Sequence, residues 1–407
     1  MLFDGLNTLV VPHRLRELSG NARGTGDATR LGLLTFAGLL AGMLVQPVAG
    51  RWSDRLRPRW GRRGMLGLGV ALMLGALVIF GLARGVLTIA IGYVLVQVAA
   101  SSAQAAQQGF IPDLVPGERR GTAAGLKGFM DVGGALLGFA LLGALLGEGK
   151  TAAALLVIAA VLVVMFALTV ALVREPAVTY AAPVRMSLVD AFRLDRTRPE
   201  DRHFMRLVLA RFLFLLAAYA VGRFFLYFVA TRLGLDPASA AGEAGSLLAV
   251  LALITVLAAP PAGWAADRWG RGALMVAGAT LSMVGVLLLI PAGSGATILL
   301  GGGIMALGSA AFASANWAST ADVAPPAEAA RYFGLANVGT AGAAAAAGLF
   351  GPLVDWANNR WPDGGYNVLF VVAALLFVAS VSPLVPTRRR LGRERRGEHD
   401  DAATEAG

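Results

Sequence analysis

The chain has 407 residues, of which 57% are hydrophobic and only 15% are charged, and its mean hydropathy is +0.67. Soluble domains carry about 25% charged residues, so this composition indicates a protein that lies mostly within a lipid bilayer. The chain has no cysteine, which excludes disulfides, zinc–thiolate sites and cysteine nucleophiles. Its three histidines, His13, His203 and His399, do not have the spacing of metal ligands, and we expect no metal and no cofactor.

The net charge of +10 raises the question of a nucleic-acid partner. The basic residues lie in short loops between apolar segments, however, and no basic domain large enough to fold alone is present. We therefore expect a lipid bilayer and a small molecule as partners, and no nucleic acid.

Apolar segments of about 20 residues recur along the chain, and each is long enough to cross the hydrocarbon core. They predict an all-α membrane protein of twelve helices, because strands with open edges cannot satisfy their hydrogen bonds in lipid. Six helices are predicted in the first part of the chain, over residues 1–12, 30–50, 65–83, 86–107, 123–147 and 151–173. Six more are predicted over residues 205–230, 240–262, 272–291, 296–320, 332–354 and 366–385.

The predicted helices divide the chain into four parts. They are an N-terminal six-helix bundle (1–173), a central loop (174–204), a C-terminal six-helix bundle (205–386) and a charged tail (387–407). Lysine and arginine are about three times as frequent in one set of alternate loops as in the other, and the positive-inside rule places the richer set in the cytoplasm. We expect a multi-pass protein of a bacterial cytoplasmic (inner) membrane, with its central loop and C-terminus in the cytoplasm.

The first predicted helix is short. About 12 residues precede His13 and Arg14, too few to cross a bilayer. We expect the native start to lie upstream, so that the chain as given has a truncated first helix. The alternative is a first segment that is re-entrant or lies at the membrane surface.

A charged motif occurs twice, half a chain apart and each time between two apolar segments. The first copy runs from Gly50 through Asp54-Arg55 to Gly61-Arg62, and the second runs through Gly263, Asp267-Arg268 and Gly270-Arg271. A second pair of loops, at residues 111–121 and 321–334, follows the two motifs in the same order. Each of these loops contains aspartate, proline and arginine. Two repeated loops in the same order predict a membrane protein built from two related halves.

Placed after the second helix of each half, these motifs resemble those of the major facilitator superfamily of transporters. The second copy matches the cytoplasmic-loop motif of that family residue for residue. The first carries the insertion Leu56-Arg57-Pro58-Arg59, which is similar to the sucrose-transporter and glycoside-cation symporter branch. The resemblance implies two six-helix bundles, transport by alternating access, and a gating role for Asp54, Arg55, Arg62, Asp267, Arg268 and Arg271. The alternative is that these loops only fix topology.

In the family that the chain resembles, helices 1, 4, 7 and 10 line a central cavity. The predicted fourth helix presents Gln97, Ser101, Gln104 and Gln108 on one face. Amides that face lipid would be costly, so this face is expected to contact water or protein. Neutral donors and acceptors suit a hydroxyl-rich or zwitterionic solute, and the alternative role is hydrogen bonding between helices.

The predicted seventh and tenth helices carry further candidates. In the seventh, Tyr219 and Arg223 share a face, and Arg223 can bind an anionic group or pair with a buried acid. In the tenth, Asn316 and Trp317 offer a hydrogen bond and a stacking surface for a sugar ring. The alternatives are that Arg223, like Arg211, extends to the membrane surface and that Trp317 marks the membrane interface.

Two acidic residues are candidates for coupling transport to protons or sodium. Asp4 lies three residues before Asn7 on the same face of the first helix. Asp131 follows Lys127 by one turn in the fifth, a spacing that also suits a structural ion pair.

The sequence contains no nucleotide-binding loop, catalytic triad or metal cluster, so we expect a transporter and not an enzyme. The favoured function is secondary active transport of a small polar solute, such as a sugar or glycoside, coupled to H⁺ or Na⁺. Two alternatives are efflux of amphipathic compounds or lipids, and a non-transporting assembly or sensory role on the same fold.

Overall fold

The computed structural model describes residues 2–19, 26–108, 110, 114, 120–173, 198–323, 329–361 and 364–384. Every regular element within these ranges is a helix, which confirms the all-α prediction. Eleven of the described helical segments are long and apolar enough to cross a membrane, equal to the number of full-length helices predicted. The charged tail lies outside the described residues, as does the predicted central loop up to residue 197, whereas residues 199–204 are helical, so the seventh helix begins at Pro199 and not at residue 205 as predicted.

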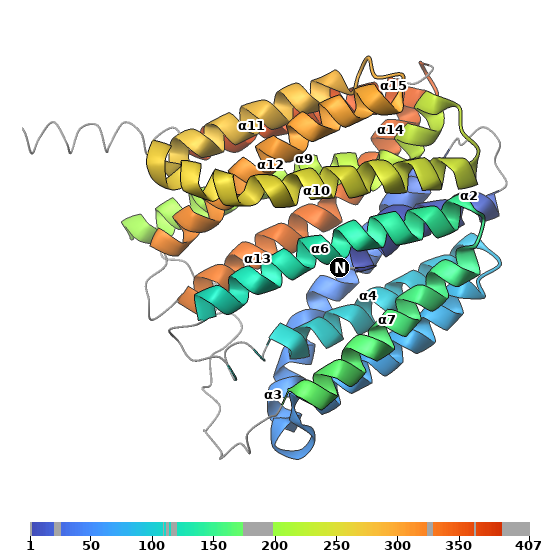
Figure 1. Ribbon diagram of the computed structural model, residues 1–407, viewed down its shortest axis with the longest axis vertical. Coiled ribbons are helices and arrows are strands. Elements are labelled where there is room, and N and C mark those ends of the chain that lie inside the picture. The colour runs from blue at the N-terminus through green and yellow to red at the C-terminus, as the bar shows by residue number, and fades with distance from the viewer. Residues whose placement is uncertain are drawn as a thin grey trace, which may run out of the picture.

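The helices fall into two consecutive sets (Figure 1). The N-terminal helices are α1 (Leu2–Gly5), the π-helical η1 (Leu6–Val10), α2 (Val11–Ser19), α3 (Asp27–Gly81), α4 (Val86–Gln108), α6 (Arg120–Gly147) and α7 (Thr151–Leu172). The C-terminal helices are α9 (Pro199–Leu233), α10 (Pro237–Trp269), α11 (Arg271–Leu288), α12 (Gly295–Val323), α13 (Ala329–Ala346), η3 (Ala347–Phe350), α14 (Gly351–Asn358), α15 (Gly364–Val381) and η4 (Ser382–Leu384).

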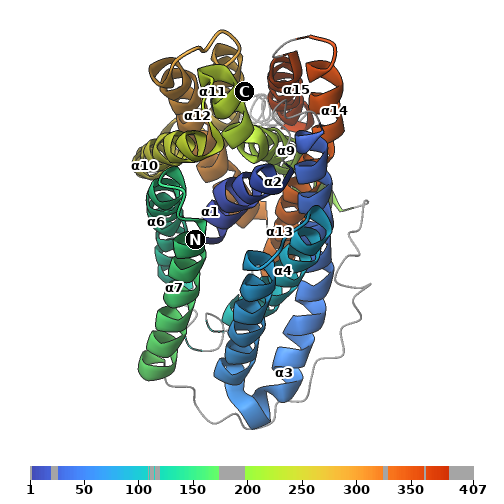
Figure 2. The same cartoon turned by 90° about the vertical axis from the view of Figure 1, so that its right-hand side faces the viewer.

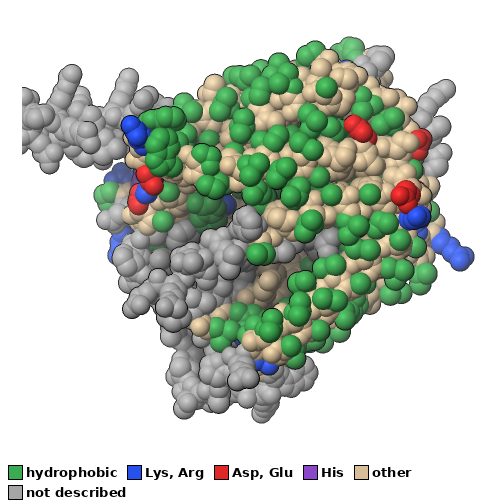
Figure 3. Space-filling view, in the orientation of Figure 1, with side chains coloured by type: hydrophobic (Ala, Val, Ile, Leu, Met, Phe, Trp, Pro, Cys, Tyr) green, Lys and Arg blue, Asp and Glu red, His purple; other side chains and the backbone are tan. Residues whose placement is uncertain are grey.

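Burial separates helices that face lipid from helices at the centre. The span of α7 has a mean hydropathy of 3.1 and only 6% of its residues are buried, whereas 61% of the span in α9 is buried. A helix that is apolar all round and hardly buried must face lipid, since water would leave it unstable. Figure 3 shows apolar side chains covering the face formed by α7, α10, α11 and α12, with charged side chains gathered at its two ends.

The helices run between two ends, which we name by the repeated motif. The motif end carries residues 50–63 and 263–272, and the opposite end carries the turns at 81–86, 147–151, 233–237, 288–295 and 358–364. In Figure 1 the two sets of helices converge toward the opposite end, on the right. Figure 2 shows α1 and α2 between the two sets.

Glycines allow the two sets to approach closely at the opposite end. A Cβ atom on Gly143 of α6 would lie 2.6 Å from the Cα of Gly245 of α10, and one on Gly348 would lie 2.3 Å from the carbonyl oxygen of Gly32. Small residues at such crossings are how membrane helices pack backbone against backbone. Contacts between the two sets are therefore tight at the opposite end.

The first helical run is longer than predicted. It continues to Ser19, seven residues beyond the expected end at residue 12, so that Arg14 lies inside α2. Arg14 donates to the carbonyl oxygens of Gly81 (3.0 Å) and Ala83 (3.1 Å) at the end of α3 and pairs with Glu17. Because the carbonyl oxygens at the end of α3 bind the Arg14 guanidinium, Arg14 can lie within α2 and does not have to mark its end.

The repeated motif forms helix ends, whereas the sequence suggested a charged loop. Helix α3 continues through residues 51–60 and breaks only at Gly61 (φ 65°, ψ 175°). Helix α10 runs to Trp269, and Gly270 (φ 89°, ψ 134°) alone joins it to α11. Positive φ is costly for residues with a Cβ atom, which explains the glycine at the same place in both copies.

Candidate binding site between the two sets of helices

A hydrogen-bonded polar cluster joins the first helical run to α4. The amide oxygen of Asn7 accepts hydrogen bonds from the Tyr93 hydroxyl and from the Gln97 amide nitrogen, both at 2.9 Å. Tyr93 is fully buried and Gln97 is 4% exposed. Because buried amides keep their hydrogen bonds in a low dielectric, this cluster fixes polar groups in the middle of an apolar bundle.

Three side chains of α9, spaced four residues apart, face the N-terminal helices. Arg223 donates to the carbonyl oxygen of Ala344 at 3.4 Å and lies within electrostatic range of the Tyr93 hydroxyl. Tyr227 donates to the carbonyl oxygen of Pro12 at 3.1 Å, and Tyr219 lies within electrostatic range of Arg223. The face predicted for this helix therefore lies where the two sets of helices meet, and Arg223 does not extend to the membrane surface.

The two acidic candidates lie beside this row. Asp4 interacts electrostatically with Asp131 of α6 and with Arg223 and Tyr219 of α9. Protein atoms surround Asp4, yet its side chain is exposed, whereas Asp131 is half-buried. Both carboxyl groups therefore lie near Arg223, in different surroundings.

The predicted amide face of α4 divides into parts with different surroundings. Gln97 belongs to the polar cluster, whereas Ser101 packs on α3, where a Cβ atom on Gly42 would lie 2.5 Å from its hydroxyl oxygen. Gln104 is exposed, and the side chain of Gln108 lies outside the described residues. Ser101 therefore makes the helix–helix contact that was the alternative for this face.

A second polar group surrounds Arg211 near the motif end of α9. The Arg211 guanidinium lies 4.2 Å from the centre of the Trp317 ring and donates to Thr340 (2.9 Å) and Asn316 (3.3 Å). Asn316 is fully buried and donates to the carbonyl oxygen of Leu207 at 3.2 Å. Arg211 was expected to extend to the membrane surface, but it is only 8% exposed. The Trp317 ring and two neutral acceptors hold its guanidinium inside the protein.

At the motif end, the described charges of the second motif bind within the C-terminal helices. Arg271 forms an ion pair with Asp322 at the end of α12 and lies 3.9 Å from Asp267. Arg268 lies 5.3 Å from the ring of Trp264, on its own helix. In the first motif, Arg62 donates to Ser53 at 3.2 Å. The side chains of Asp54 and Arg55 lie outside the described residues.

At the opposite end, polar contacts cross between the two sets of helices. The His13 ring donates to the carbonyl oxygen of Pro237 at 3.1 Å, and Asp355 accepts from the backbone N–H of Thr29 at 2.7 Å. His13 also lies 3.1 Å from Glu17, and this contact, with the hydrogen bond from Arg14, lowers the pKa of the Glu17 carboxyl to about 2. Together with Tyr227, these groups connect the two sets on that side.

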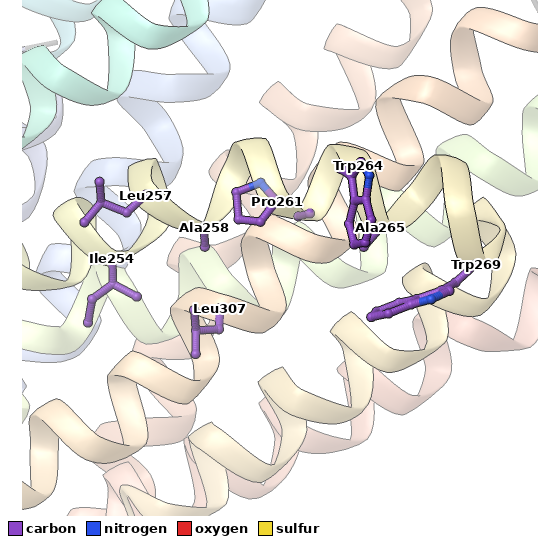
Figure 4. Close-up of a pocket in the computed structure, with 9 residues that line it drawn as sticks. Ile254, Leu257, Ala258, Pro261, Trp264, Ala265, Trp269 and Leu307 are labelled. Carbon is purple, nitrogen blue, oxygen red and sulfur yellow. The ribbon is translucent and has the colours of Figure 1, made fainter.

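An apolar groove lies apart from the polar groups described above. It is formed on α10 and α12 by Ile254, Leu257, Ala258, Pro261, Trp264, Trp269 and Leu307 (Figure 4). Trp264 and Trp269 are more than half exposed. Its lining suits a lipid chain and offers little to a polar solute.

The sequence did not identify several residues of the site. Tyr93 lies one turn before Gln97 on the predicted amide face, so the same spacing could have indicated it. Asn7 was noted only for its position beside Asp4, and Thr340 of α13 gave no sequence signal because its contact with Arg211 depends on tertiary packing. Among the described residues, no group of three or more histidine, cysteine and acidic side chains could hold a metal ion.

Comparisons with known proteins agree with this architecture. The sequence matches the family model of the Major Facilitator Superfamily over residues 3–242 and again over residues 207–404. No curated protein sequence matches the chain. Nothing in these comparisons singles out the sucrose-transporter or glycoside-cation symporter branch.

Three solved structures illustrate the likeness of fold. A bacterial homologue of the human lysosomal transporter Spinster, in an inward-facing and occupied conformation, has a TM-score of 0.70 and 14% identity, covering 95% of this chain and 94% of that one. A D-xylose–proton symporter has a TM-score of 0.65 and 17% identity, covering 92% and 94%. A peptide transporter in complex with sulfate has a TM-score of 0.67 and 15% identity, covering 96% and 92%. Since the family model matches nearly the whole chain and these structures share its helical fold, the chain belongs to the Major Facilitator Superfamily, a family of membrane transporters.

Proposed function

We propose that the chain is a secondary active transporter that moves a small polar solute by alternating access. The observation that carries this proposal is the polar cluster of Asn7, Tyr93 and Gln97, which faces Arg223 across the junction of the two sets of helices. Buried polar groups within a membrane are costly and are typical of substrate and ion pathways. We further propose that residues 1–173 and 205–386 act as two six-helix halves.

The polar side chains of the site indicate the chemical class of solute that we propose. Hydroxyl and amide groups suit a solute rich in hydroxyl groups, and a sugar or glycoside has that character. The inserted residues of the first motif favour the glycoside-cation symporter branch. Gln97, Gln104, Gln108, Tyr219, Arg223, Asn316 and Trp317 are the proposed cavity residues, with Ser101 as a packing residue beside them.

We propose that Asp4 and Asp131 couple transport to H⁺ or Na⁺. The two carboxyl groups interact with each other, and Asp4 also interacts with Arg223. A proton or a sodium ion that neutralises one of them changes the charge next to the bound solute, which is the linkage that coupled transport needs. Their position beside the polar cluster supports this role.

The repeated motif is proposed as a gate at the motif end. Arg271 and Asp267 contact partners within the C-terminal helices, and close glycine contacts lie at the opposite end. We propose that Asp54, Arg55 and Arg62 engage Asp267, Arg268 and Arg271 only when the motif end closes. From the positive-inside rule we propose that this end, the central loop and the C-terminus lie in the cytoplasm, and that the membrane is a bacterial inner membrane.

The experiment is uptake into proteoliposomes from a panel of sugars, glycosides and amino acids, with and without imposed proton or sodium gradients. We expect gradient-driven accumulation of one class, reduced at least ten-fold by Gln97→Ala and unchanged by Gln107→Ala. Gln107 is an exposed amide on the same helix and serves as the matched control. Asp4→Asn is expected to abolish accumulation while exchange of solute across the membrane continues.

A result against the proposal would be well-folded protein that accumulates nothing under any gradient. The apolar groove around Trp264 and Trp269 favours a second candidate in that case, the efflux of amphipathic compounds or lipids. Loss of amphipathic efflux on Leu257→Asn, with Gln97→Ala without effect, would support that candidate.

A further inference from the structure

The Arg223 guanidinium is buried with few partners. Its side chain is 8% exposed, and among the described residues its one hydrogen bond goes to a neutral oxygen, the carbonyl of Ala344, with the Tyr93 hydroxyl within electrostatic range. The Nε atom is buried and has no hydrogen-bond partner among the residues that the structure describes. A guanidinium has five N–H donors, so this cation has unused donors in the interior of the protein.

Among the residues that the structure describes, no carboxylate neutralises this cation at close range. Within the described ranges, no acidic oxygen lies within 4 Å of Arg223, although Asp4 acts on it from further away. Leaving a charge buried without a counter-charge is costly, so such an arrangement is typical of a functional site that a ligand completes. Arg211, the other buried arginine of α9, differs because Trp317, Asn316 and Thr340 occupy its guanidinium.

The groups around Arg223 define what would fit beside it. Tyr93 and Tyr219 provide hydroxyls, and Gln97 provides an amide already bonded to Asn7. A carboxylate or a phosphate group can accept two parallel hydrogen bonds from the planar guanidinium, which an uncharged hydroxyl cannot do. The remaining polar groups match hydroxyl or carbonyl oxygens on the same solute.

Arg211 provides a second positive charge at a distance from Arg223. It lies 12 residues before Arg223 on α9, about 18 Å along the helix axis and nearer the motif end. One small solute cannot bind both guanidinium groups at once over that distance. Arg211 therefore adds positive potential on the motif side of Arg223, and Arg223 is the place where the anionic group binds.

We propose that Arg223 is the binding site for an anionic group, so that the transported solute is a small organic anion bearing a carboxylate or a phosphate. This inference rests on the proposed transport function and narrows it. A purely neutral solute would leave the guanidinium uncompensated. The anionic group would lie against Arg223 and Tyr93, with the neutral part of the solute toward Gln97.

The test is equilibrium binding to the purified full-length protein, measured by titration calorimetry at fixed ionic strength. Three matched pairs serve as ligands: gluconate with sorbitol, glycerol 3-phosphate with glycerol, and succinate with 1,4-butanediol. We expect at least one anion to bind ten-fold or more tightly than its neutral counterpart. Gluconate or succinate binding alone would identify a carboxylate, and glycerol 3-phosphate binding alone a phosphate.

Two variants test the role of Arg223 itself. Arg223→Gln is expected to weaken binding of the anion at least ten-fold and to leave any weak binding of its neutral counterpart unchanged. Arg223→Lys, which keeps the charge and provides a second variant if the first fails to fold, should recover part of the affinity. Arg84→Gln removes an exposed arginine at the opposite end and should change nothing.

Each result bears on the proposal. If no anion binds more tightly than its neutral counterpart, or if Arg223→Gln binds the anion as the unmodified protein does, the anion site is refuted. If binding depends on Arg223 but proteoliposomes accumulate no anion under any gradient, the anion site stands and coupled uptake is refuted. The two proposals therefore fail in different measurements.

Discussion

At the scale of single residues, the interior of α9 is shaped by two arginines in different surroundings. Arg211 bonds Thr340 and Asn316 and lies over the Trp317 ring, whereas Arg223 has an Nε atom without a partner among the described residues. A satisfied buried cation adds to stability through its contacts, and an unsatisfied one is expected where a ligand binds. Arg211 is thus expected to stabilise the fold, whereas Arg223 is proposed to bind the solute.

Replacing Arg211 by lysine tests its structural contribution. Arg211→Lys keeps the positive charge but loses the planar fork that reaches Thr340 and Asn316 while lying on Trp317. We expect a loss of about 1–3 kcal/mol in the free energy of unfolding, because buried acceptors are left unpaired. Thermal unfolding in detergent measures this, with Arg84→Lys as the exposed control. Equal melting temperatures for the two variants would mean that these contacts contribute nothing.

At the scale of helices, glycine decides which pairs can touch. Helices α6 and α10 cross with Gly143 against Gly245, and a Cβ atom on Gly245 would lie 2.4 Å from the Cα of Gly143 and 2.8 Å from the carbonyl oxygen of Phe139. Both neighbours are backbone atoms that cannot rotate away. The crossing, which holds the two sets of helices together at the opposite end, therefore requires a residue without a side chain.

Gly245→Ala is accordingly expected to be destabilising even though alanine favours helices. The added methyl group must push α6 and α10 apart, at a cost of about 1–3 kcal/mol that exceeds the gain in helix propensity. Gly75→Ala in α3 is the matched control, since nothing lies within 4 Å of its Cβ position, and it should be neutral or stabilising by up to about 1 kcal/mol. Thermal unfolding of both variants decides the matter. If the melting temperature of Gly245→Ala equals or exceeds that of Gly75→Ala, the close approach of α6 and α10 at this glycine pair is contradicted.

At the scale of the whole molecule, the side-chain hydrogen bonds that cross between the two sets lie at the opposite end, within the part of the chain that the structure describes. Tyr227 bonds Pro12, His13 bonds Pro237 and Asp355 bonds the backbone of Thr29. The described charges of the second motif bind partners within the C-terminal helices. The described contacts thus join the two sets at the opposite end, and the proposed alternating access requires that these contacts break when the motif end closes.

A disulfide across the closed end would test whether it has to open. The chain has no cysteine, so Thr29→Cys with Asp355→Cys introduces the only pair. The backbone nitrogen of Thr29 lies 2.7 Å from the Asp355 carboxylate, so the two residues are neighbours across this end. We expect oxidation to reduce uptake at least ten-fold and dithiothreitol to restore it. Each single cysteine variant should be insensitive to oxidation, and full uptake by the oxidised pair would show that this end need not open.

The sequence by itself determined the all-α fold, eleven full-length helices and the face of α9 that carries Tyr219 and Arg223. These follow from hydropathy and from a period of 3.6 residues, both of which are local. Only the tertiary structure decided that Arg211 is buried under Trp317, that Ser101 packs on Gly42 and that Asn7 joins Tyr93 to Gln97. Each of these contacts depends on which helices are neighbours. The sequence of a helix limits its possible neighbours but does not select one, because an apolar helix surface packs equally well against lipid and against another apolar helix.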